Sequence, residues 1–395
     1  MAIEESQKIE RARPLRTGMV GGGTGAFIGA VHRMAMRLDD RYAFMAGALS
    51  SDGERAHQSG LVLGLDPARS YRSLAAMIAG ERGRTDGIEV GVVVTPNHHH
   101  FDACKALLEA GIDVICDKPM TTTLPQALEL VRLVKQTGRS FVLTQNNTAY
   151  PMTRQARAMV RRGELGTIRV VQVSYAQDWL TGLLEASGQK QAAWRTDPAQ
   201  AGVGGSIGDI GVHAFNLAAF ITGLELESVC ADIQTFVEGR KLDDNAHVLL
   251  RYQGGARGML WSSQVAPGNN NRLQIGIYGD KGGLEWMGEA PDNLRFTPVG
   301  AEPRTIVRGG AGANDFAAHG TRMPSGHPEG YIEGFGVLYR DAADLILAAR
   351  EGRPGPAMTA LLPTVLDGAK GVRFIDAVVA SSRAGGTWVD ARLPL

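Results

Sequence analysis

The chain has 395 residues, 44% of them hydrophobic and 21% charged, which is the composition of an ordinary globular protein. Its 41 basic residues balance its 41 acidic residues, so we expect no polyanionic partner such as nucleic acid. The three cysteines show no CxxC spacing, which argues against a disulfide framework or a zinc–thiolate site and favours a reducing cytoplasm. No apolar run reaches the ~18 residues of a membrane span, and the polar N-terminus lacks the apolar segment of a secretory signal.

A chain of this length exceeds a typical single core, so we expect more than one domain. In the first part of the chain, strand-like runs alternate with helical segments, as in "IEVGVVVT" (88–95) and "IDVICD" (112–117) with a helix between them. Such alternation predicts an α/β fold that begins with a doubly wound parallel sheet, the Rossmann arrangement. The expected division is a loose tail over 1–15, a dinucleotide-binding domain over 16–150, and a substrate-binding and oligomerisation domain over 151–395.

A glycine-rich turn, "GMVGGGTGAFIGAVHR", follows the first strand and opens a helix. Gly21, Gly23 and Ala26 fit the pattern G-x-G-x-x-G/A, in which glycines let the backbone approach a pyrophosphate at a helix N-terminus. This context predicts dinucleotide binding. The expected cofactor contacts in the turn are Gly21, Gly23, Thr24, Gly25, Ala26, Phe27 and Ile28.

The second strand is where an acidic residue would bind the ribose 2′-hydroxyl of NAD. The sequence there is "GALSSDGERA", with Ser50 at the expected position, Ser51 next to it and Asp52 two residues later. Serine hydroxyls can bind either a free ribose hydroxyl or a 2′-phosphate, and the nearest arginine is Arg55. We therefore predict NAD as the cofactor, because no clear basic phosphate clamp is visible, and leave NADP open.

A later strand ends in "VICDKPMTTT" (114–123), which places Lys118 directly before a proline. Proline cannot continue a ladder, so the strand stops there. In an α/β protein the C-terminal end of a parallel strand faces the crevice where ligands bind. Lys118 is thus either a solvated turn residue or a cation that acts on the substrate.

Three ordered motifs, "TPNHHH" (95–100), "CDKP" (116–119) and "GGSIGDIGVH" (204–213), resemble those of the Gfo/Idh/MocA oxidoreductases. Asp117 stands where the family's turn usually has a glutamate. The stretches "QDW" (177–179), "WR" (194–195) and "HPEGY" (327–331) are similar to the sugar and inositol dehydrogenase branch. The resemblance implies further cofactor contacts at Thr95, Pro96, Asn97, His100, Asp117, Lys118 and Asn146.

Asp209 and His213 lie four residues apart at the start of an expected helix, so both should project from one helical face. A carboxylate in that position can orient an imidazole, and histidine suits the removal of an alcohol proton near neutral pH. Lys118 would then stabilise charge on the reacting oxygen. We predict Lys118, Asp209 and His213 as catalytic, and as substrate-binding Lys118, Tyr150, Gln177, Trp179, Arg195, Asp209, His213 and His327.

The triple histidine at 98–100 invites a metal interpretation, which we reject because adjacent histidines rarely converge on one ion. The second half of the chain holds five long strand candidates between 167 and 280, with helices at 331–351 and 358–383. These predict an α+β domain with a large, mostly antiparallel open sheet. Because the family uses the free face of this sheet for association, the resemblance implies a homodimer or homotetramer.

The sequence therefore predicts an NAD(P)-dependent dehydrogenase that oxidises a ring hydroxyl of a cyclic polyol or sugar to a ketone. One alternative is an NAD-dependent glycosidase or glycoside 3-oxidoreductase of the same fold. The other is a non-catalytic sugar or nucleotide sensor, which would not need the lysine, aspartate and histidine set.

Overall fold

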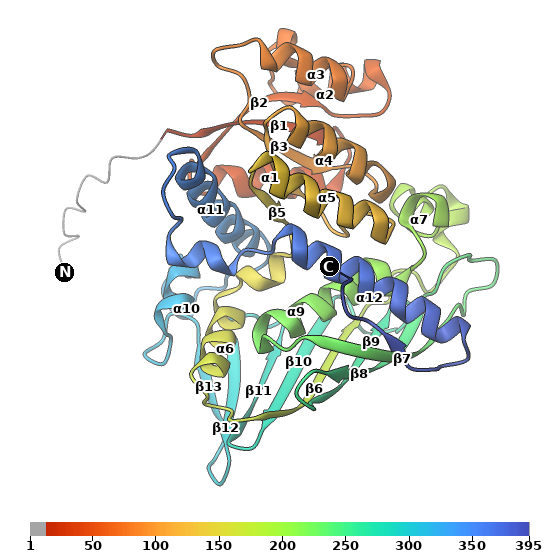
Figure 1. Cartoon of the computed structure of the whole chain (residues 1–395), viewed down its shortest axis with the longest axis vertical. Coiled ribbons are helices and arrows are strands. Elements are labelled where there is room, and N and C mark those ends of the chain that lie inside the picture. The colour runs from red at the N-terminus through yellow and green to blue at the C-terminus, as the bar shows by residue number, and fades with distance from the viewer. Residues whose placement is uncertain (1–12, 395) are drawn as a thin grey trace, which may run out of the picture.

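The computed structural model describes residues 13–394, so the expected tail over 1–15 lies almost wholly outside the described residues. Two sheets divide the described chain, one in each half, as Figure 1 shows. No helix within residues 13–394 is long and apolar enough to cross a membrane.

The N-terminal sheet has five parallel strands in the order β2-β1-β3-β4-β5 within residues 13–394. Its central strands are short and buried on both faces, as their continuous valine and isoleucine runs require. The order reverses beside β1, which creates the crevice where such folds bind their ligands. The strands are β1 (Leu15–Gly21), β2 (Tyr42–Ala48), β3 (Val90–Val94), β4 (Asp113–Cys116) and β5 (Phe141–Leu143).

Helices cover both faces of this sheet, which confirms the predicted doubly wound arrangement. One face packs against α1 (Phe27–Arg37) and α11 (Tyr331–Arg350). The other packs against α3 (Leu74–Arg82), α4 (His100–Glu109) and α5 (Leu124–Thr137), together with the start of α12 (Val365–Arg383). Helix α2 (Gly53–Val62) follows β2 at the edge.

The C-terminal sheet runs β13-β12-β11-β10-β6-β9-β8-β7-β14 and is antiparallel except for β6 and β9. This confirms the large, mostly antiparallel sheet that the sequence predicts. The hairpin strands β11 to β13 were not predicted, because they are short and interrupted by glycine, proline and charged residues. The strands are β6 (Ile168–Ala176), β7 (Leu226–Gln234), β8 (Asn245–Tyr252), β9 (Arg257–Ser263), β10 (Arg272–Gly279), β11 (Gly282–Met287), β12 (Asn293–Pro298), β13 (Arg304–Val307) and β14 (Val389–Asp390).

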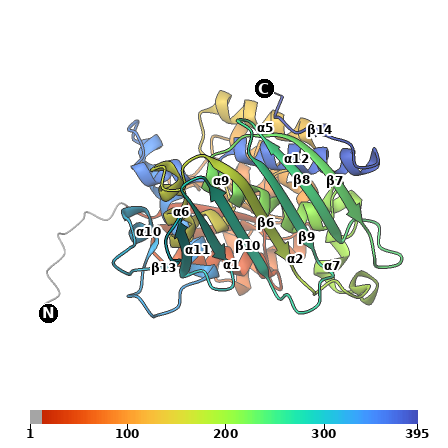
Figure 2. The same cartoon turned by 90° about the horizontal axis from the view of Figure 1, so that it is seen from below.

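One face of this sheet packs against α6 (Pro151–Arg161), α9 (Val212–Thr222) and α12. No helix within residues 13–394 lies over the other face, as the view from below shows (Figure 2). Strands of the sheet alternate accordingly, with apolar residues inward and mixed residues outward. Three short helices lie outside these layers: α7 (Lys190–Arg195), α8 (Pro198–Ala201) and α10 (Asp315–Gly320).

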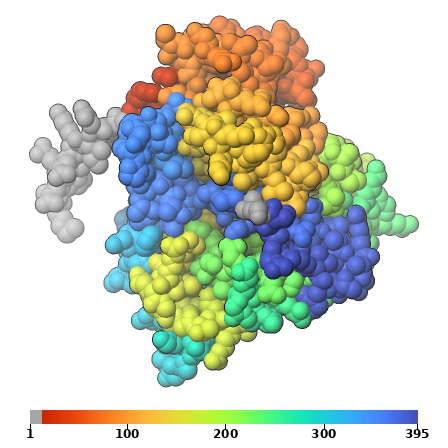
Figure 3. Space-filling model, viewed as in Figure 1, coloured from red at the N-terminus to blue at the C-terminus, as the bar shows by residue number. Residues whose placement is uncertain are grey.

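The C-terminal helices join the two halves. Helix α11 follows the second sheet in the chain, yet it packs in the same hydrophobic cluster as β1, β3 and α1. In the space-filling view this C-terminal part, coloured blue, lies between the N-terminal half above and the sheet-bearing half below (Figure 3). The division at residue 150 remains a prediction, since α11 contributes to the core of the first sheet.

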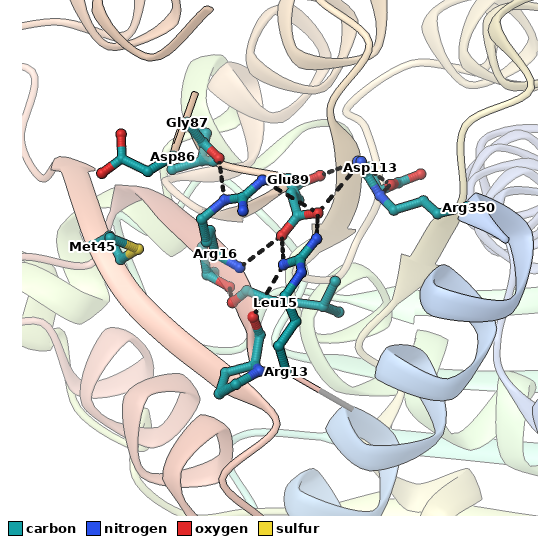
Figure 4. A network of polar contacts seen from close by, with 12 residues as sticks. Arg13, Leu15, Arg16, Met45, Asp86, Gly87, Glu89, Asp113 and Arg350 are labelled. Atoms are coloured by element: carbon teal, nitrogen blue, oxygen red, sulfur yellow. Dashed lines mark hydrogen bonds and ion pairs between the residues drawn. The ribbon is translucent and has the colours of Figure 1, made fainter. Parts of the chain in front are cut away.

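Charged side chains tie α11 to the strands at the opposite end of the parallel sheet from the crevice. Arg350 of α11 donates to the carboxylate of Asp113, with Nε 2.8 Å from Oδ2. Glu89 accepts from Arg13 at 2.6 Å and from the backbone nitrogen of Arg16 at 3.2 Å (Figure 4). These contacts lie at the start of β1, β3 and β4, so they hold the N-terminal strands against α11.

Candidate active site

A cavity of about 640 Å³ opens at the C-terminal ends of the parallel strands. It runs from the glycine turn after β1, past the ends of β2 and β3, to the tip of β4 and the short helix α7. The sequence-predicted cofactor residues that line it are Gly21, Gly23, Thr24, Ala26, Phe27, Ile28, Ser50, Ser51, Arg55, Thr95, Pro96, Asn97, Asp117 and Lys118.

The glycine turn fits a dinucleotide because backbone replaces side chains there. A Cβ on Gly29 would lie 2.2 Å from the carbonyl oxygen of Gly22, so helix α1 can approach the turn only with glycine. The buried Arg33 donates to that same carbonyl at 2.6 Å and fixes the turn. At the N-terminus of α1, Ala26 supplies no side-chain cap, which leaves backbone N–H groups free to bind a pyrophosphate.

Three predicted cofactor residues lie elsewhere. Gly25 adopts the left-handed conformation at φ 80° but is not among the lining residues, and Asn146 is buried in the short helix 146–149. His100 is buried behind the cavity, with Nδ1 2.8 Å from the carbonyl of Pro119 and Nε2 2.8 Å from that of Thr95. His100 therefore connects the two strand-end turns instead of lining the cavity.

Lys118, at the tip of β4, is directed into the cavity and not into solvent. Its Nζ donates to the backbone oxygen of Asp209 at 2.6 Å and to Oδ1 at 2.8 Å, and its side chain is only 14% exposed. Asp117 before it accepts from Thr144 at 2.7 Å and lies 3.9 Å from the buried imidazole of His32. Lys118 is thus a held cation at the crevice, which rules out the solvated-turn interpretation.

A π-helical turn, Ile207–Gly211, places Asp209. Its carboxylate accepts from Lys118 and, at Oδ2, from Gln264 at 2.9 Å, with Arg195 Nε 3.4 Å away. The sequence predicts that Asp209 hydrogen-bonds His213 along a regular helix, but the described residues show no such bond. The ammonium, amide and guanidinium groups around the Asp209 carboxylate take its oxygens instead.

The imidazole of His213, in the first turn of α9, instead meets Asn147. Its Nδ1 lies 3.3 Å from Nδ2 of Asn147, and the ring of Tyr175 is 6.1 Å away. Within residues 13–394, Nε2 has no hydrogen-bond partner. Asn147 was missed by the sequence analysis, although it follows the predicted Asn146 directly.

A row of polar side chains extends from this imidazole along β6. Asn271 Oδ1 accepts from the Tyr175 hydroxyl and from Gln177 Nε2, both at 2.7 Å. Gln177 Oε1 in turn accepts from Trp179 Nε1 at 3.0 Å. Two of these residues, Gln177 and Trp179, were predicted from sequence; the other two were not, because only the sheet register brings them into line.

Two predicted substrate residues lie outside the polar row and the cavity lining. Tyr150 is buried in the core of the C-terminal half, with its ring 5.6 Å from that of Trp286. His327 is exposed in the loop before α11, where its Nδ1 lies 3.3 Å from the carbonyl of Pro324. The same "HPEGY" stretch contributes a different residue: Tyr331 begins α11, and its hydroxyl lies within the electrostatic reach of Asp117 and Asp209.

Burial and charge set the ionisation of the cluster. Burial and the charge of Lys118 lower the pKa of His213 to about 3, so the imidazole is neutral at physiological pH. Burial alone would raise the pKa of Asp209, but Lys118 and Arg195 hold it well below its ordinary value. Burial and the Asp117 carboxylate raise the pKa of Tyr331. The site therefore combines a fixed ion pair with a neutral imidazole and a neutral phenol.

The triple histidine does not form a cluster. The ring centroids of His98 and His99 lie 3.8 Å apart with the rings tilted, and both residues line the cavity, whereas His100 turns inward. Among the described residues no group of three or more histidine, cysteine or acidic side chains is placed to hold a metal ion.

A Rossmann sheet with a dinucleotide cavity, lined by a lysine that contacts a carboxylate beside a neutral imidazole, defines a dinucleotide-dependent oxidoreductase. Comparison with known proteins agrees. Residues 15–145 match the oxidoreductase family with an NAD-binding Rossmann fold, and residues 153–285 match the GFO/IDH/MocA C-terminal domain. The chain belongs to the Gfo/Idh/MocA family, and it is an NAD-dependent oxidoreductase.

Several relatives align over nearly the whole chain. An oxidoreductase structure from Sinorhizobium meliloti is 49% identical, with TM-score 0.87, and the match covers 96% of this chain and 100% of that one. An inositol dehydrogenase homologue from Azotobacter vinelandii, solved with NAD+, is 36% identical, with TM-score 0.91 and coverage of 96% and 98%. The oxidoreductase YfiI of Bacillus subtilis is 34% identical over 96% of this chain and 97% of its own.

Proposed function

We propose that the protein oxidises a ring hydroxyl of a cyclic polyol or sugar to a ketone. The observation that carries this proposal is the contact of Lys118, which lines the dinucleotide cavity, with Asp209 beside the neutral imidazole of His213. The inositol dehydrogenase homologue among the relatives supports a cyclic polyol as the substrate class.

Each side chain has a distinct part in this reaction. Bound NAD supplies a nicotinamide ring that accepts a hydride from the carbinol carbon. Lys118 stabilises the negative charge that grows on the substrate oxygen as its proton leaves. Asp209 holds Lys118 in place and, with Gln264 and Arg195 on its other oxygen, stays ionised.

His213 accepts the hydroxyl proton at Nε2. For this the ring must carry its own proton on Nδ1, where a carbonyl oxygen can accept it. In the structure the donor Nδ2 of Asn147 faces Nδ1. After a half-turn of the amide, Oδ1 would accept from the Nδ1–H, and Asn147 would then select the tautomer whose Nε2 is the base. The C–H and O–H bonds of the substrate break, a C=O bond forms, and the proton remains on His213.

The polar row along β6 supports a substrate with several hydroxyl groups. Tyr175, Asn271, Gln177 and Trp179 are held by one another at 2.7–3.0 Å, so their remaining donors and acceptors keep fixed directions. Arg195, stacked on Trp194 at 4.2 Å, closes the cavity from α7. Fixed polar groups of this kind reject analogues that lack a matching hydroxyl.

The test is a panel of cyclic polyols and sugars with NAD, followed by NADH formation at 340 nm. The proposal expects turnover with a ring polyol or a pyranose and loss of turnover in the His213→Asn variant. Release of nitrophenol from a nitrophenyl glycoside without net NADH formation would instead identify the glycosidase. Binding of sugar with no turnover of any substrate would identify a sensor.

The proposal also covers the cellular compartment and the oligomeric state of the enzyme. The three cysteines are unpaired in the structure, which supports a reducing cytoplasm. The outer face of the C-terminal sheet, which no described helix covers, supports a homodimer or homotetramer.

A further inference from the structure

A second cavity, of about 610 Å³, lies apart from the cofactor cavity, and among the described residues the two share no lining residue. It opens between α6, α9 and the start of α12, which neighbour one another in Figure 1. The short helix Ala357–Leu361 and residues 391–393 also contribute to its lining. Its size suits a small organic ligand, because ligand pockets in proteins typically measure ~300–1,000 Å³. The reaction proposed above does not use this cavity.

The cavity holds a guanidinium group without an acidic partner. Arg157 of α6 lies over the ring of Phe220, with Cζ 4.8 Å from the ring centroid, and its Nη1 donates to the carbonyl oxygen of Phe220. Its Nε is buried without a hydrogen-bond partner, and no carboxylate within residues 13–394 forms an ion pair with Arg157. Burial and the neighbouring Arg161 lower the pKa of Arg157 to about 10, so the group stays charged at neutral pH. A charge in this position is costly unless an anion neutralises it.

The charges that line the cavity do not cancel. Four cations, Arg157, Arg161, Lys370 and Arg392, line it together with two acids, Glu225 and Asp367. Lys370 and Glu225 neutralise each other, with Nζ 2.7 Å from Oε1, and Arg392 is engaged by Asp390 outside the lining. The two remaining arginines exceed Asp367 by one positive charge. A monoanion such as a carboxylate fits this excess better than a phosphate dianion does.

A neutral polar group lines the same cavity. Asn216 of α9 is only 6% exposed, and its Oδ1 is buried without a hydrogen-bond partner. A buried acceptor in this state costs free energy, which a hydroxyl group of a ligand would recover. If the amide turned over, it would present a donor instead, and a hydroxyl can accept from that donor as well. The cavity therefore offers one partner for a carboxylate and another for a hydroxyl group.

We propose that this cavity binds a small hydroxylated monocarboxylate, whose carboxylate contacts the guanidinium of Arg157 and whose hydroxyl contacts the amide of Asn216. Because Phe220 engages only Nη1, Nε and Nη2 remain as one edge of the guanidinium fork. Such an edge donates two parallel hydrogen bonds to a carboxylate. The inference goes beyond the proposed reaction and does not depend on it, since the cofactor cavity is a separate site.

The experiment is isothermal titration calorimetry of the full chain without cofactor, with gluconate as the probe and glucitol as its uncharged counterpart. We expect a Kd for gluconate of about 1 mM or tighter, the range of a ligand this small, and binding of glucitol that is weaker by at least about tenfold. Arg157→Gln should weaken gluconate binding by about tenfold to a hundredfold, the scale of hydrogen bonds to a charged group. Arg162→Gln, directly after α6 and outside the lining, is the matched control and should change nothing.

Asn216→Leu is a second variant that leaves the charges in place. It should weaken gluconate binding by about twofold to tenfold, the scale of one neutral hydrogen bond, and keep or raise Tm because it removes an unpartnered buried acceptor. Unchanged gluconate binding in either variant, with a cooperative thermal transition to show that it is folded, would overturn the proposal. So would a wild-type chain that binds glucitol or inorganic phosphate as tightly as gluconate. Weaker binding in Lys118→Met but not in Arg157→Gln would place the probe in the cofactor cavity and would overturn the proposal too.

Discussion

At the residue scale, Lys118 combines three properties that rarely occur together: burial, a carboxylate partner and access to the cofactor cavity. Lys118 lines the cavity while its ammonium group contacts the carbonyl of Asp209, so we expect it to reach a substrate oxygen with little movement. A cation that is already held in this way needs no reorganisation when charge develops on the substrate.

We therefore expect Lys118→Met to lower kcat by about 10²–10³, the scale for losing one positioned electrostatic donor, and to leave NADH binding within a few-fold. Steady-state kinetics with the preferred substrate and a cofactor titration measure the two effects. Lys105→Met on the exposed face of α4 is the matched control and should behave as wild type. An unchanged kcat in Lys118→Met would remove this residue from the reaction.

The pH dependence of the reaction follows from the neighbours of His213. The sequence alone suggests a histidine that titrates near neutrality, but burial and Lys118 lower the pKa of His213 to about 3. A lowered pKa means that the unprotonated base is fully present above about pH 5 and is lost only as the pH falls toward that value.

We thus expect the pH profile of kcat/KM for oxidation to show no change between pH 5 and 8 that comes from the titration of His213. The profile of wild type, compared with that of His213→Asn, measures this directly, since kcat/KM reports the ionisation of the enzyme before substrate binds. A limb near pH 6–7 in wild type that vanishes in His213→Asn would show that the imidazole titrates near neutrality after all.

At the scale of elements, the π-helical turn is what brings Asp209 to Lys118. Asp243, buried at the start of the segment before β8, anchors this turn: its carboxylate accepts from the backbone nitrogens of Gly205 at 2.5 Å and Ile207 at 2.9 Å. The backbones of Gly205 and Asp243 also pack closely, because a Cβ on Gly205 would lie 2.1 Å from the carbonyl oxygen of Asp243.

Asp243→Asn leaves one oxygen to accept where two accepted before, so a buried backbone N–H loses its partner. We expect a loss of about 1–3 kcal/mol in the free energy of unfolding and a lower kcat, because Asp209 loses its position. Thermal unfolding and kinetics measure the two. Asp232→Asn, on an exposed part of β7, is the control; equal stability of the two variants would show that the turn holds itself.

The elements also show which parts of the site can be predicted from the sequence. The glycine turn, the strand-end lysine and the lining of the first half depend on local motifs, and the structure brings most of these residues to one cavity. The partners of His213 and Asp209 do not depend on local motifs. Asn147, Gln264 and Asn271 come from three separate segments, and only tertiary packing brings them together. His327 and Tyr331 show a finer limit of prediction from sequence. The sequence identifies the stretch "HPEGY" that holds both residues, but which of the two side chains lies near the site depends on where α11 begins.

At the scale of the whole molecule, the outer face of the C-terminal sheet carries no helix from the described part of the chain (Figure 2). The register places Leu249 of β8 opposite Met259 of β9 and Val170 of β6 opposite Tyr278 of β10, all on this face. Their side chains are 36–49% exposed, which is unusual for large apolar residues across adjacent strands. The inner face of the same strands buries the core, so the pattern is not a slipped register.

We expect this face to associate with a second copy of the chain, since a C2 contact pairs one apolar patch with itself. The double variant Leu249→Asp, Met259→Asp should then run as a monomer in light scattering after size exclusion, because it places like charges across the contact. Val62→Asp, which changes an equally apolar side chain that is 72% exposed on α2, is the control and should keep the wild-type mass. A wild-type chain that is monomeric at micromolar concentration, or a double variant with an unchanged mass, would show that the outer face is not the interface.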